Sequence, residues 1–366
     1  MLRVTGMGMV VDEKTTKAHE ACHEHGYIIG LPGMSIKPTV ALVLPIKIAQ
    51  QMFTEGEMTL LKVHAEVVGP IMPEDPGFGA AVREAQVVLG GWGTPKFDDA
   101  LLKQFPELRL LAYSAGSVKT TVTDSFYERG LKVTTSASAN AVPVAEFTVA
   151  MMQALLKQVF WLAPAFARGG RGAIMDRMSH VRELSNLEVG LVGASRIGHE
   201  VVRLLKSYAS LHVKMYDPYL SDEQAKEMGV SLSTLEEVCA CEVVSIHAPN
   251  IPETRHMFNA RMLALLPDHG ILINTSRGAL IDEQALVDEV MRRPLYVLLD
   301  VTDPEPPASD SKLRTLENVI LTPHIAGAMN QARLEMGKLA IEEAIRFLVG
   351  QPLRYEVTKD MLATQA

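Results

Sequence analysis

Cysteine is scarce in this sequence. The 366 residues include only Cys22, Cys239 and Cys241, and a single residue separates the last two. Such a set does not resemble a disulfide framework, so we expect reduced thiols in an intracellular protein. The N-terminus also lacks the basic stretch, apolar run and small-residue cleavage site of a secretory signal, because Asp12 and Glu13 interrupt it early. These absences favour a cytoplasmic protein.

Long apolar runs and clustered basic residues are missing as well. We find no apolar stretch of the length that a membrane span needs, which argues against a membrane partner. Acidic residues outnumber basic ones by 43 to 35, which gives a net charge of −8. The basic residues are scattered and few adjoin an aromatic side chain, so nothing favours binding to nucleic acid.

The size and composition of the chain indicate two globular domains. A single hydrophobic core rarely grows beyond about 300 residues, and this chain is longer. The sequence is 48% hydrophobic and 21% charged, which leaves enough apolar side chains for two cores. No fixed-period repeat is visible, and this excludes a solenoid.

Residues 1–36 do not resemble the rest of the chain, and we expect them to form a poorly ordered N-terminal extension. Three imidazoles and a thiol lie close together there, on His19, Cys22, His23 and His25. Zinc or copper would accept such ligands. No second ligand cluster supports a closed site, so a solvated extension is the favoured alternative and no metal is predicted.

From residue 38 onward, short apolar runs alternate with helical patterns. This alternation predicts a parallel sheet covered by helices. The expected strands are 39–44, 65–68, 86–89 and 108–112, and the expected helices are 98–104 and 123–129.

A long helix is expected over 142–159, and a second alternation begins at residue 188. Its expected strands are 188–192, 211–216, 242–247, 270–274, 296–301 and 319–321. Six strands with helices between most of them match a doubly wound dinucleotide-binding fold. The stretch 329–348 is predicted to be an amphipathic helix.

A glycine-rich turn follows the first strand of this second alternation. It reads Gly193-Ala194-Ser195-Arg196-Ile197-Gly198 and opens a predicted helix, so it is a G-x-G-x-x-G pattern with Ser195 at the middle glycine. A pyrophosphate needs backbone N–H groups at a helix N-terminus with no bulk in the way. Serine is small, and its hydroxyl could itself donate to a phosphate oxygen.

Asp217 strengthens the prediction of a cofactor site. It ends the next strand, about 20 residues beyond Gly198, where an acid accepts hydrogen bonds from the adenosine ribose. A carboxylate there repels a 2′-phosphate, so NAD is favoured over NADP. The alternative is a turn residue at a strand end, before Pro218.

Three segments at predicted strand ends carry groups suited to hydride chemistry on a 2-oxo acid. They are 274–278 with Arg277, 300–306 with two aspartates and Glu305, and 322–327 with His324. The carboxyl ends of parallel strands bind ligands in open α/β sheets. The chemistry needs a cation for the substrate carboxylate, an acid/base, and a group that orients the acid/base.

Together these segments resemble the D-isomer-specific 2-hydroxyacid dehydrogenases, the family of D-glycerate, D-lactate and D-3-phosphoglycerate dehydrogenases. The resemblance extends from about Lys37 to Val357. Besides the glycine turn and the strand-end segments, it rests on the runs 140–146 (Asn-Ala-Val-Pro-Val-Ala-Glu) and 247–249 (His-Ala-Pro).

The resemblance implies an α/β protein with two Rossmann-like or flavodoxin-like domains, each a doubly wound parallel sheet, after the N-terminal extension. The substrate domain would comprise 37–142 and 328–358, and the NAD-binding domain 143–327. The chain crossings near Pro143 and Gly327 would act as hinges. Members of the family typically dimerise through the cofactor domain and its long helix, so a homodimer is expected.

By the same resemblance, Arg277 binds the substrate, His324 is the acid/base and Glu305 is its carboxylate partner. A carboxylate beside a histidine favours the imidazolium form, which is a proton donor for carbonyl reduction. Arginine can present two parallel donors to a carboxylate, which lysine cannot. The alternatives are an exposed arginine, a loop glutamate and a histidine satisfied within the fold.

The resemblance also implies a set of binding residues. NAD contacts are expected from Gly193, Ser195, Arg196, Ile197, Gly198, Asp217, His247, Ala248, Pro249, Thr254, Thr275, Ser276, Asp300 and Gly327. Substrate contacts are expected from Gly91, Trp92, Gly93, Thr94, Gly116 and Ser117, of which Gly91–Thr94 would offer backbone N–H groups. For Trp92, ordinary packing is the alternative.

We therefore predict an NAD-dependent oxidoreductase that interconverts a small D-2-hydroxy acid and its 2-oxo acid, similar to a hydroxypyruvate or glyoxylate reductase. The alternative is an NAD(H)-sensing, corepressor-like binding protein with the same fold. A formate dehydrogenase is disfavoured, because that type has a glutamine in place of Glu305. Two departures from the family pattern are Ser195 and Lys119, where many members have aspartate or asparagine.

Overall fold

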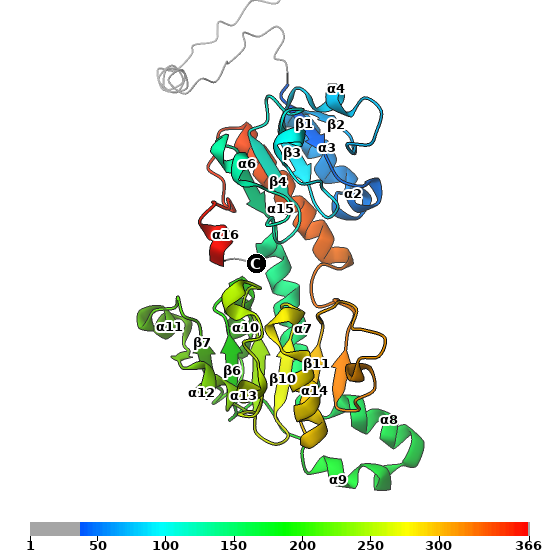
Figure 1. Ribbon diagram of the computed structural model, residues 1–366, viewed down its shortest axis with the longest axis vertical. Coiled ribbons are helices and arrows are strands. Elements are labelled where there is room, and N and C mark those ends of the chain that lie inside the picture. Colours follow the sequence, from blue (N-terminus) through cyan, green and yellow to red (C-terminus); the bar gives the residue numbers. More distant parts are fainter. Residues whose placement is uncertain (1–36, 365–366) are drawn as a thin grey trace, which may run out of the picture.

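A long helix, α7 (Ala137–Leu156), connects two parallel sheets in residues 37–364, the part of the chain that the computed structural model describes (Figure 1). The N-terminal extension, with the candidate ligands His19, Cys22, His23 and His25, lies outside the described residues. Within the described residues, no group of three His, Cys, Asp or Glu side chains is arranged to hold a metal ion.

The first sheet has five parallel strands in the order β2-β1-β3-β4-β5, which is the flavodoxin-like arrangement. The last of these strands was not expected from the sequence. Its strands are β1 (Thr39–Leu42), β2 (Glu66–Val68), β3 (Ala85–Gly90), β4 (Leu110–Tyr113) and β5 (Lys132–Thr135). Its helices are α2 (Ile46–Met52), α3 (Glu55–His64), α4 (Phe78–Val82), α5 (Asp99–Leu102), α6 (Asp124–Glu128) and α15 (Asn330–Leu348).

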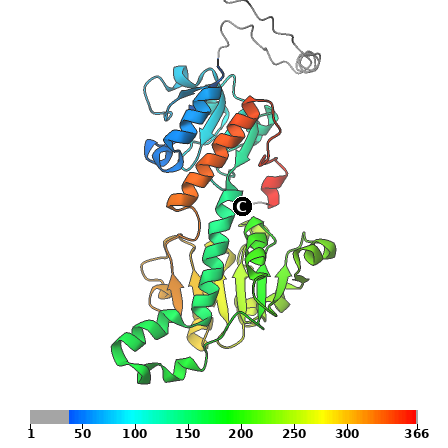
Figure 2. The ribbon, with the colours of Figure 1, turned by 180° about the vertical axis from the view of Figure 1, so that it is seen from behind.

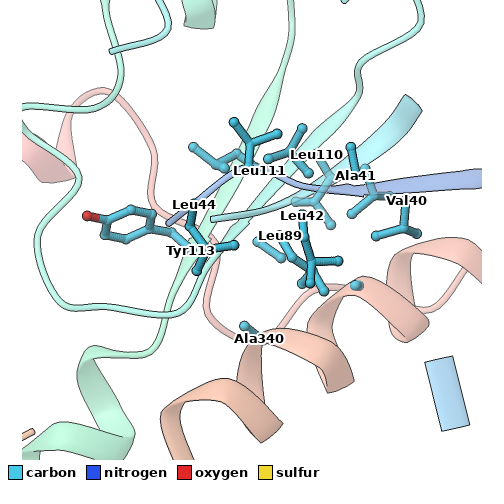
Figure 3. Close-up of a cluster of buried hydrophobic side chains, with 14 of the residues drawn as sticks. Val40, Ala41, Leu42, Leu44, Leu89, Leu110, Leu111, Tyr113 and Ala340 are labelled. Atoms are coloured by element: carbon cyan, nitrogen blue, oxygen red, sulfur yellow. The ribbon is translucent and has the colours of Figure 1, made fainter. Parts of the chain in front are cut away.

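The core of this domain lies between the sheet and α15, which returns from the far end of the sequence. Apolar side chains of the central strands, such as Leu42, Leu89 and Leu111, gather above the helix near Ala340 (Figure 3). Gly337 of α15 lies so close to α2 that a Cβ atom there would be 1.8 Å from the Met52 carbonyl oxygen. The C-terminal helix is thus part of the first domain.

The second sheet has seven parallel strands in the order β12-β11-β10-β9-β6-β7-β8, so the strand order reverses between β6 and β9. Six strands were expected; the seventh, β8 (Ser231–Leu232), is too short to give a pattern. The others are β6 (Glu188–Val192), β7 (His212–Tyr216), β9 (Val243–Ile246), β10 (Ile271–Asn274), β11 (Tyr296–Leu299) and β12 (Val319–Leu321). Its helices are α10 (Arg196–Leu205), α11 (Asp222–Met228), α12 (Leu235–Cys239), α13 (Ala260–Leu263) and α14 (Glu283–Arg292).

Helix α7 differs from its prediction at both ends. It begins at Ala137, five residues before the expected start. Pro143 is a residue type that favours the first turn of a helix, but here it lies inside the helix. By length and composition it could cross a membrane, so the expectation that no stretch reaches that length was wrong. Its buried side nevertheless packs against α10, α15 and β10, which is the environment of a core helix.

An arm leaves the second domain directly after α7 (Figures 1 and 2). The chain turns at Gln158, which has a left-handed backbone (φ 55°), and continues as α8 (Val159–Gly169) and α9 (Met175–Met178). The sequence had predicted one uninterrupted helix up to residue 159. No side chain of α8 is buried. The remaining short helices are η2 (Arg171–Ile174), η3 (Pro252–Thr254), η4 (Gly278–Leu280), η5 (Lys312–Arg314) and α16 (Met361–Thr364).

Candidate active site

The glycine turn lies at the point where the strand order of the second sheet reverses. Gly193 has a φ of +102°, and a Cβ there would be 2.7 Å from the carbonyl carbon of His247. A Cβ on Gly198 would be 2.2 Å from the Gly193 carbonyl oxygen. Both positions require glycine, because the turn is pressed between α10 and the end of β9.

Ser195 forms the N-cap of α10. Its hydroxyl oxygen accepts a hydrogen bond from the Gly198 N–H at 3.3 Å, so its own O–H remains available to donate. The N–H groups of Arg196 and Ile197, in the first turn, have no partner inside the helix. Together they provide donors and a positive helix end for an anion.

Asp217 lies directly beside this turn. Its Oδ2 accepts a hydrogen bond from the Ala194 N–H at 2.7 Å, and its Oδ1 accepts one from the Tyr219 N–H at 2.8 Å. Each carboxylate oxygen keeps a second lone pair. The carboxylate is therefore fixed where it could accept the hydroxyls of a ribose.

A cavity of about 460 Å³ separates the N-terminal ends of α7 and α10. It is lined by Ser138, Ala141, Ala194, Arg196, His199 and Glu200. The Ser138 hydroxyl is buried without a hydrogen-bond partner in the described part of the chain, and Glu200 is paired with Arg203 at 2.7 Å. The hydroxyl and the free helix N-terminus are donors that fit a pyrophosphate, and the Asp217 carboxylate is an acceptor that fits a ribose of a dinucleotide.

His247 lies behind the glycine turn, at the end of β9. It is 2% exposed, and neither ring nitrogen has a hydrogen-bond partner among the described residues. Burial lowers the pKa of His247 to about 3, so the imidazole is neutral at physiological pH.

The loop that follows His247 is closed by Thr254, whose hydroxyl donates to the Pro249 carbonyl at 2.6 Å and accepts from the Ile251 N–H at 3.1 Å. Ala248, which precedes Pro249, is buried.

The loop after β10 is held by its own polar side chains. The Ser276 hydroxyl donates to the Ile246 carbonyl at 2.7 Å, and the Asn274 amide donates to the Arg277 carbonyl at 2.9 Å. The Thr275 hydroxyl meets that of Thr148 in α7 at 3.2 Å. Both hydroxyls of the loop point inward, and the Ser276 N–H donates to the Asn274 Oδ1 at 3.0 Å, so the backbone of Thr275 is the part of the loop best placed for a cofactor.

Arg277 projects from this loop with an exposed side chain. Its Nη1 donates to the Ser276 carbonyl at 2.6 Å. Desolvation lowers the pKa of the guanidinium, while the charge of nearby Glu305 raises it. Arg277 therefore lies within electrostatic reach of the carboxylate that accompanies the histidine.

His324 and Glu305 form a direct pair. The Nδ1 of His324 lies 2.7 Å from the Oε1 of Glu305, and the two side chains are 49% and 41% exposed. His324 has a left-handed backbone with a φ of +53°, a conformation that non-glycine residues adopt mainly where the surrounding structure enforces it. The structure thus brings together the arginine, the glutamate and the histidine that the sequence singled out.

Asp300 enforces this conformation. It is 1% exposed, and its carboxylate accepts hydrogen bonds from the Thr322 hydroxyl at 2.6 Å and from the N–H groups of Ile325 and Ala326 at 2.9 Å. Its carbonyl oxygen accepts the His324 N–H at 3.0 Å. Asp300 therefore anchors the histidine loop; its expected contact with the nicotinamide part of the cofactor stays a prediction.

The loop after β3 offers fewer donors than the sequence suggested. The Gly91 N–H donates to the Thr94 hydroxyl at 2.7 Å, and the Thr94 N–H donates to the Gly91 carbonyl at 3.0 Å. This leaves the N–H groups of Trp92 and Gly93, the latter with a φ of +85°. The Trp92 ring packs under the Arg333 guanidinium, 5.5 Å from its centroid, so packing accounts for part of its role.

The loop after β4 brings a second cation to the same region. Gly116 faces open space, and the Ser117 hydroxyl accepts the Lys119 N–H at 3.4 Å. Desolvation lowers the pKa of Lys119, and the charge of Arg277 lowers it further. Lys119 and Arg277, from different domains, are therefore close enough for their charges to interact.

The second chain crossing lies against the first. A Cβ on Gly327 would be 2.6 Å from the Oδ1 of Asn140, at the start of α7. Gly327 thus allows the two chain crossings to pack closely, and its expected contact with NAD stays a prediction. Sequence reasoning missed Ser138 and Tyr355, which lie near Arg196; neither belongs to a motif.

The burial of His247 makes a prediction about acid stability. Between its folded pKa of about 3 and its ordinary value of 6.5, the unfolded chain binds a proton that the folded protein excludes. The free energy of unfolding should therefore fall as the pH is lowered through this window, by about 2 kcal/mol at about pH 5 from this residue. Urea unfolding at about pH 7.5 and pH 5 should show a smaller fall for His247→Gln than for the parent.

The matched control is His212→Gln, which changes an exposed histidine of the same domain and should leave the pH dependence unaltered. An equal fall in the parent and in His247→Gln would show that His247 is not the responsible group.

Comparisons with known proteins agree with this fold. Residues 149–326 match the family model described as the NAD binding domain of D-isomer specific 2-hydroxyacid dehydrogenase. The D-3-phosphoglycerate dehydrogenase of Methanocaldococcus jannaschii is 30% identical over 274 residues, which are 74% of this chain and 51% of that protein. That of Bacillus subtilis is 29% identical over 276 residues, 73% of this chain and 51% of that protein. The chain thus spans about half the length of these curated relatives.

Solved structures have the same architecture. A protein from Thermus thermophilus matches with a TM-score of 0.69 and 27% identity, over 87% of this chain and all of that one (100%). The apo form of D-mandelate dehydrogenase from Rhodotorula graminis matches with a TM-score of 0.75 over 88% of this chain and 98% of that one, and at 22% identity it shows the fold alone. Two parallel α/β domains are therefore confirmed, and residues 149–326 form an NAD-binding domain of the D-isomer-specific 2-hydroxyacid dehydrogenase family.

Proposed function

We propose that this protein interconverts a small D-2-hydroxy acid and its 2-oxo acid in an NAD-dependent reaction. The observation that carries the proposal is the pair of His324 and Glu305, 2.7 Å apart, within electrostatic reach of Arg277. All three follow strands of the NAD-binding sheet at its carboxyl edge. Bound NAD would supply or accept the hydride.

Arg277 would bind the substrate. Its exposed guanidinium has no ion-pair partner within 4 Å among the described residues, so its remaining N–H groups are free for a carboxylate. A planar guanidinium can also donate to the adjacent carbonyl oxygen and stabilise negative charge that develops there.

His324 would move the proton. Because Nδ1 is held by Glu305, Nε2 is the nitrogen left to face the substrate. In the direction of reduction, Nε2–H would give its proton to the carbonyl oxygen of the substrate, and the imidazole would become neutral. In the direction of oxidation it takes the hydroxyl proton, and the Glu305 carboxylate stabilises the resulting imidazolium.

For the substrate, we propose the class of hydroxypyruvate and glyoxylate. The curated relatives are named for D-3-phosphoglycerate, so phosphohydroxypyruvate belongs in the same test. A panel of 2-oxo acids with purified protein and NADH should give steady NADH consumption, ranked by kcat/KM. Binding of NADH without consumption of any 2-oxo acid would instead favour the NAD(H)-sensing alternative.

The His324→Ala variant tests the proton transfer. We expect kcat/KM for the best 2-oxo acid to fall by a factor of about 10² to 10⁴, which is the usual contribution of a general acid. The Kd of NADH, measured by fluorescence titration, should stay within about twofold, because the ring is exposed and its loop is anchored by Asp300. Equal losses of turnover and NADH binding would make His324 a structural residue.

Asp217→Ala tests the cofactor preference. Removing the carboxylate should weaken the binding of NADH more than that of NADPH. NADH loses an acceptor for its ribose hydroxyls, whereas NADPH is relieved of a charge that repels its 2′-phosphate. The ratio of the two Kd values, from parallel titrations, should move by roughly tenfold towards NADPH. Tyr219→Ala, at an exposed neighbour, is the control, and an unchanged ratio in Asp217→Ala would refute the assignment.

We also propose a homodimer in the cytoplasm. The arm of α8 and α9 exposes Val159, Phe166, Met175 and Met178 at 47%, 57%, 60% and 42%, an apolar surface that a second copy of the chain would cover. Light scattering should give twice the mass of the chain for the parent and a lower mass for Phe166→Asp. A parent that is monomeric at all concentrations would rule the dimer out. The cytoplasmic location is supported by Cys239 and Cys241, which are free thiols.

A further inference from the structure

Two residues from different domains meet at the rim of the cofactor cavity. The guanidinium carbon of Arg196 lies 5.9 Å from the centroid of the Tyr355 ring, which is within the range of a cation–π contact. Arg196 is the first residue of α10 and lines the cavity beside the glycine turn. Tyr355 lies between α15 and α16, in a segment that returns towards α10 in both views (Figures 1 and 2).

The segment that carries Tyr355 is firmly attached to the first domain. The Glu343 carboxylate, 1% exposed in α15, accepts the N–H groups of Arg354 and Tyr355 at 2.9 and 3.1 Å. The Tyr355 carbonyl accepts the Thr135 N–H of β5 at 3.3 Å. Beyond it, Glu356 is paired with Lys132 of the same strand at 3.0 Å. The ring therefore has a fixed base from which to meet the second domain.

The guanidinium of Arg196, by contrast, has no other polar partner in residues 37–364: it takes part in no hydrogen bond or ion pair there. A contact on its face leaves the donors in its plane unused. The buried Ser138 hydroxyl, also without a partner among these residues, lines the same cavity. A phosphate oxygen is the acceptor that such a donor set would take.

We propose that Tyr355 is a positioning residue for the dinucleotide: its ring holds the Arg196 guanidinium with its edge towards the pyrophosphate. A free arginine side chain loses rotamer freedom when it binds, and the ring removes part of that loss beforehand. The first domain thereby contributes to the affinity of the second domain for its cofactor. The inference concerns the same site as the proposed function and adds a residue that no motif contains.

The experiment is a double-mutant cycle on NADH binding, measured by fluorescence titration and calorimetry without a second substrate. Tyr355→Ala should raise the Kd of NADH by about two- to fivefold, the factor that corresponds to an exposed cation–π contact. Tyr355→Phe keeps the ring and should bind like the parent. Arg196→Ala should weaken binding more, and Tyr355→Ala should have no further effect in that background.

Glu356→Ala is the control for the segment, because it removes the ion pair with Lys132 and leaves the ring in place. Its Kd should equal that of the parent. An unchanged Kd in Tyr355→Ala, additive effects of the two substitutions, or an equal loss in Glu356→Ala would each overturn the inference. Since no turnover is measured, a protein that binds NADH in this way but reduces no 2-oxo acid would refute the proposed function and leave the role of Tyr355 intact.

Discussion

The buried carboxylate of Asp300 is the constraint on which the chemical site depends. An aspartate that is removed from water must be hydrogen-bonded, and here the Thr322 hydroxyl and two consecutive backbone N–H groups satisfy it. Those bonds draw the chain after β12 back over the end of β11. The turn leaves His324 in a left-handed conformation and directs its ring outwards to Glu305. An interaction inside the fold thus places the reactive group at its surface.

At the glycine turn, too, tight packing inside the fold leaves polar groups exposed at its surface. Gly193 and Gly198 allow the turn to approach β9 without side chains, and His247 fills the space behind it as a neutral, buried ring. With the interior closed in this way, the N–H groups at the N-terminal end of α10 remain exposed and without partners inside their helix. The anion site is therefore a consequence of how tightly the turn is packed.

Much of this was predictable from local sequence. Strands that alternate with helices indicated the two parallel sheets, and the positions of Arg277, Glu305 and His324 directly after successive strands placed them at one sheet edge. A two-residue strand such as β8 has too few residues for a pattern. The inward bonds of Asp300 and the contact of Arg196 with Tyr355 join segments far apart in the chain, so no local periodicity encodes them. The same holds for Thr94, whose hydroxyl uses the Gly91 N–H that the sequence had offered to the substrate.

The division of labour between the domains follows from where each side chain is anchored. Arg277, Glu305 and His324 all belong to loops of the second sheet, so the contact between His324 and Glu305 and the nearby charge of Arg277 stay in place if that domain moves as one body. Trp92, Gly93 and Lys119 belong to loops of the first sheet, and Lys119 lies within electrostatic reach of Arg277. A rotation about the crossings, where Gly327 lies against Asn140, would change the distance between the two groups without disturbing the catalytic set. If the proposed function holds, the chemistry would be fixed in one domain, and the first domain would be free to vary in the substrate that it accepts.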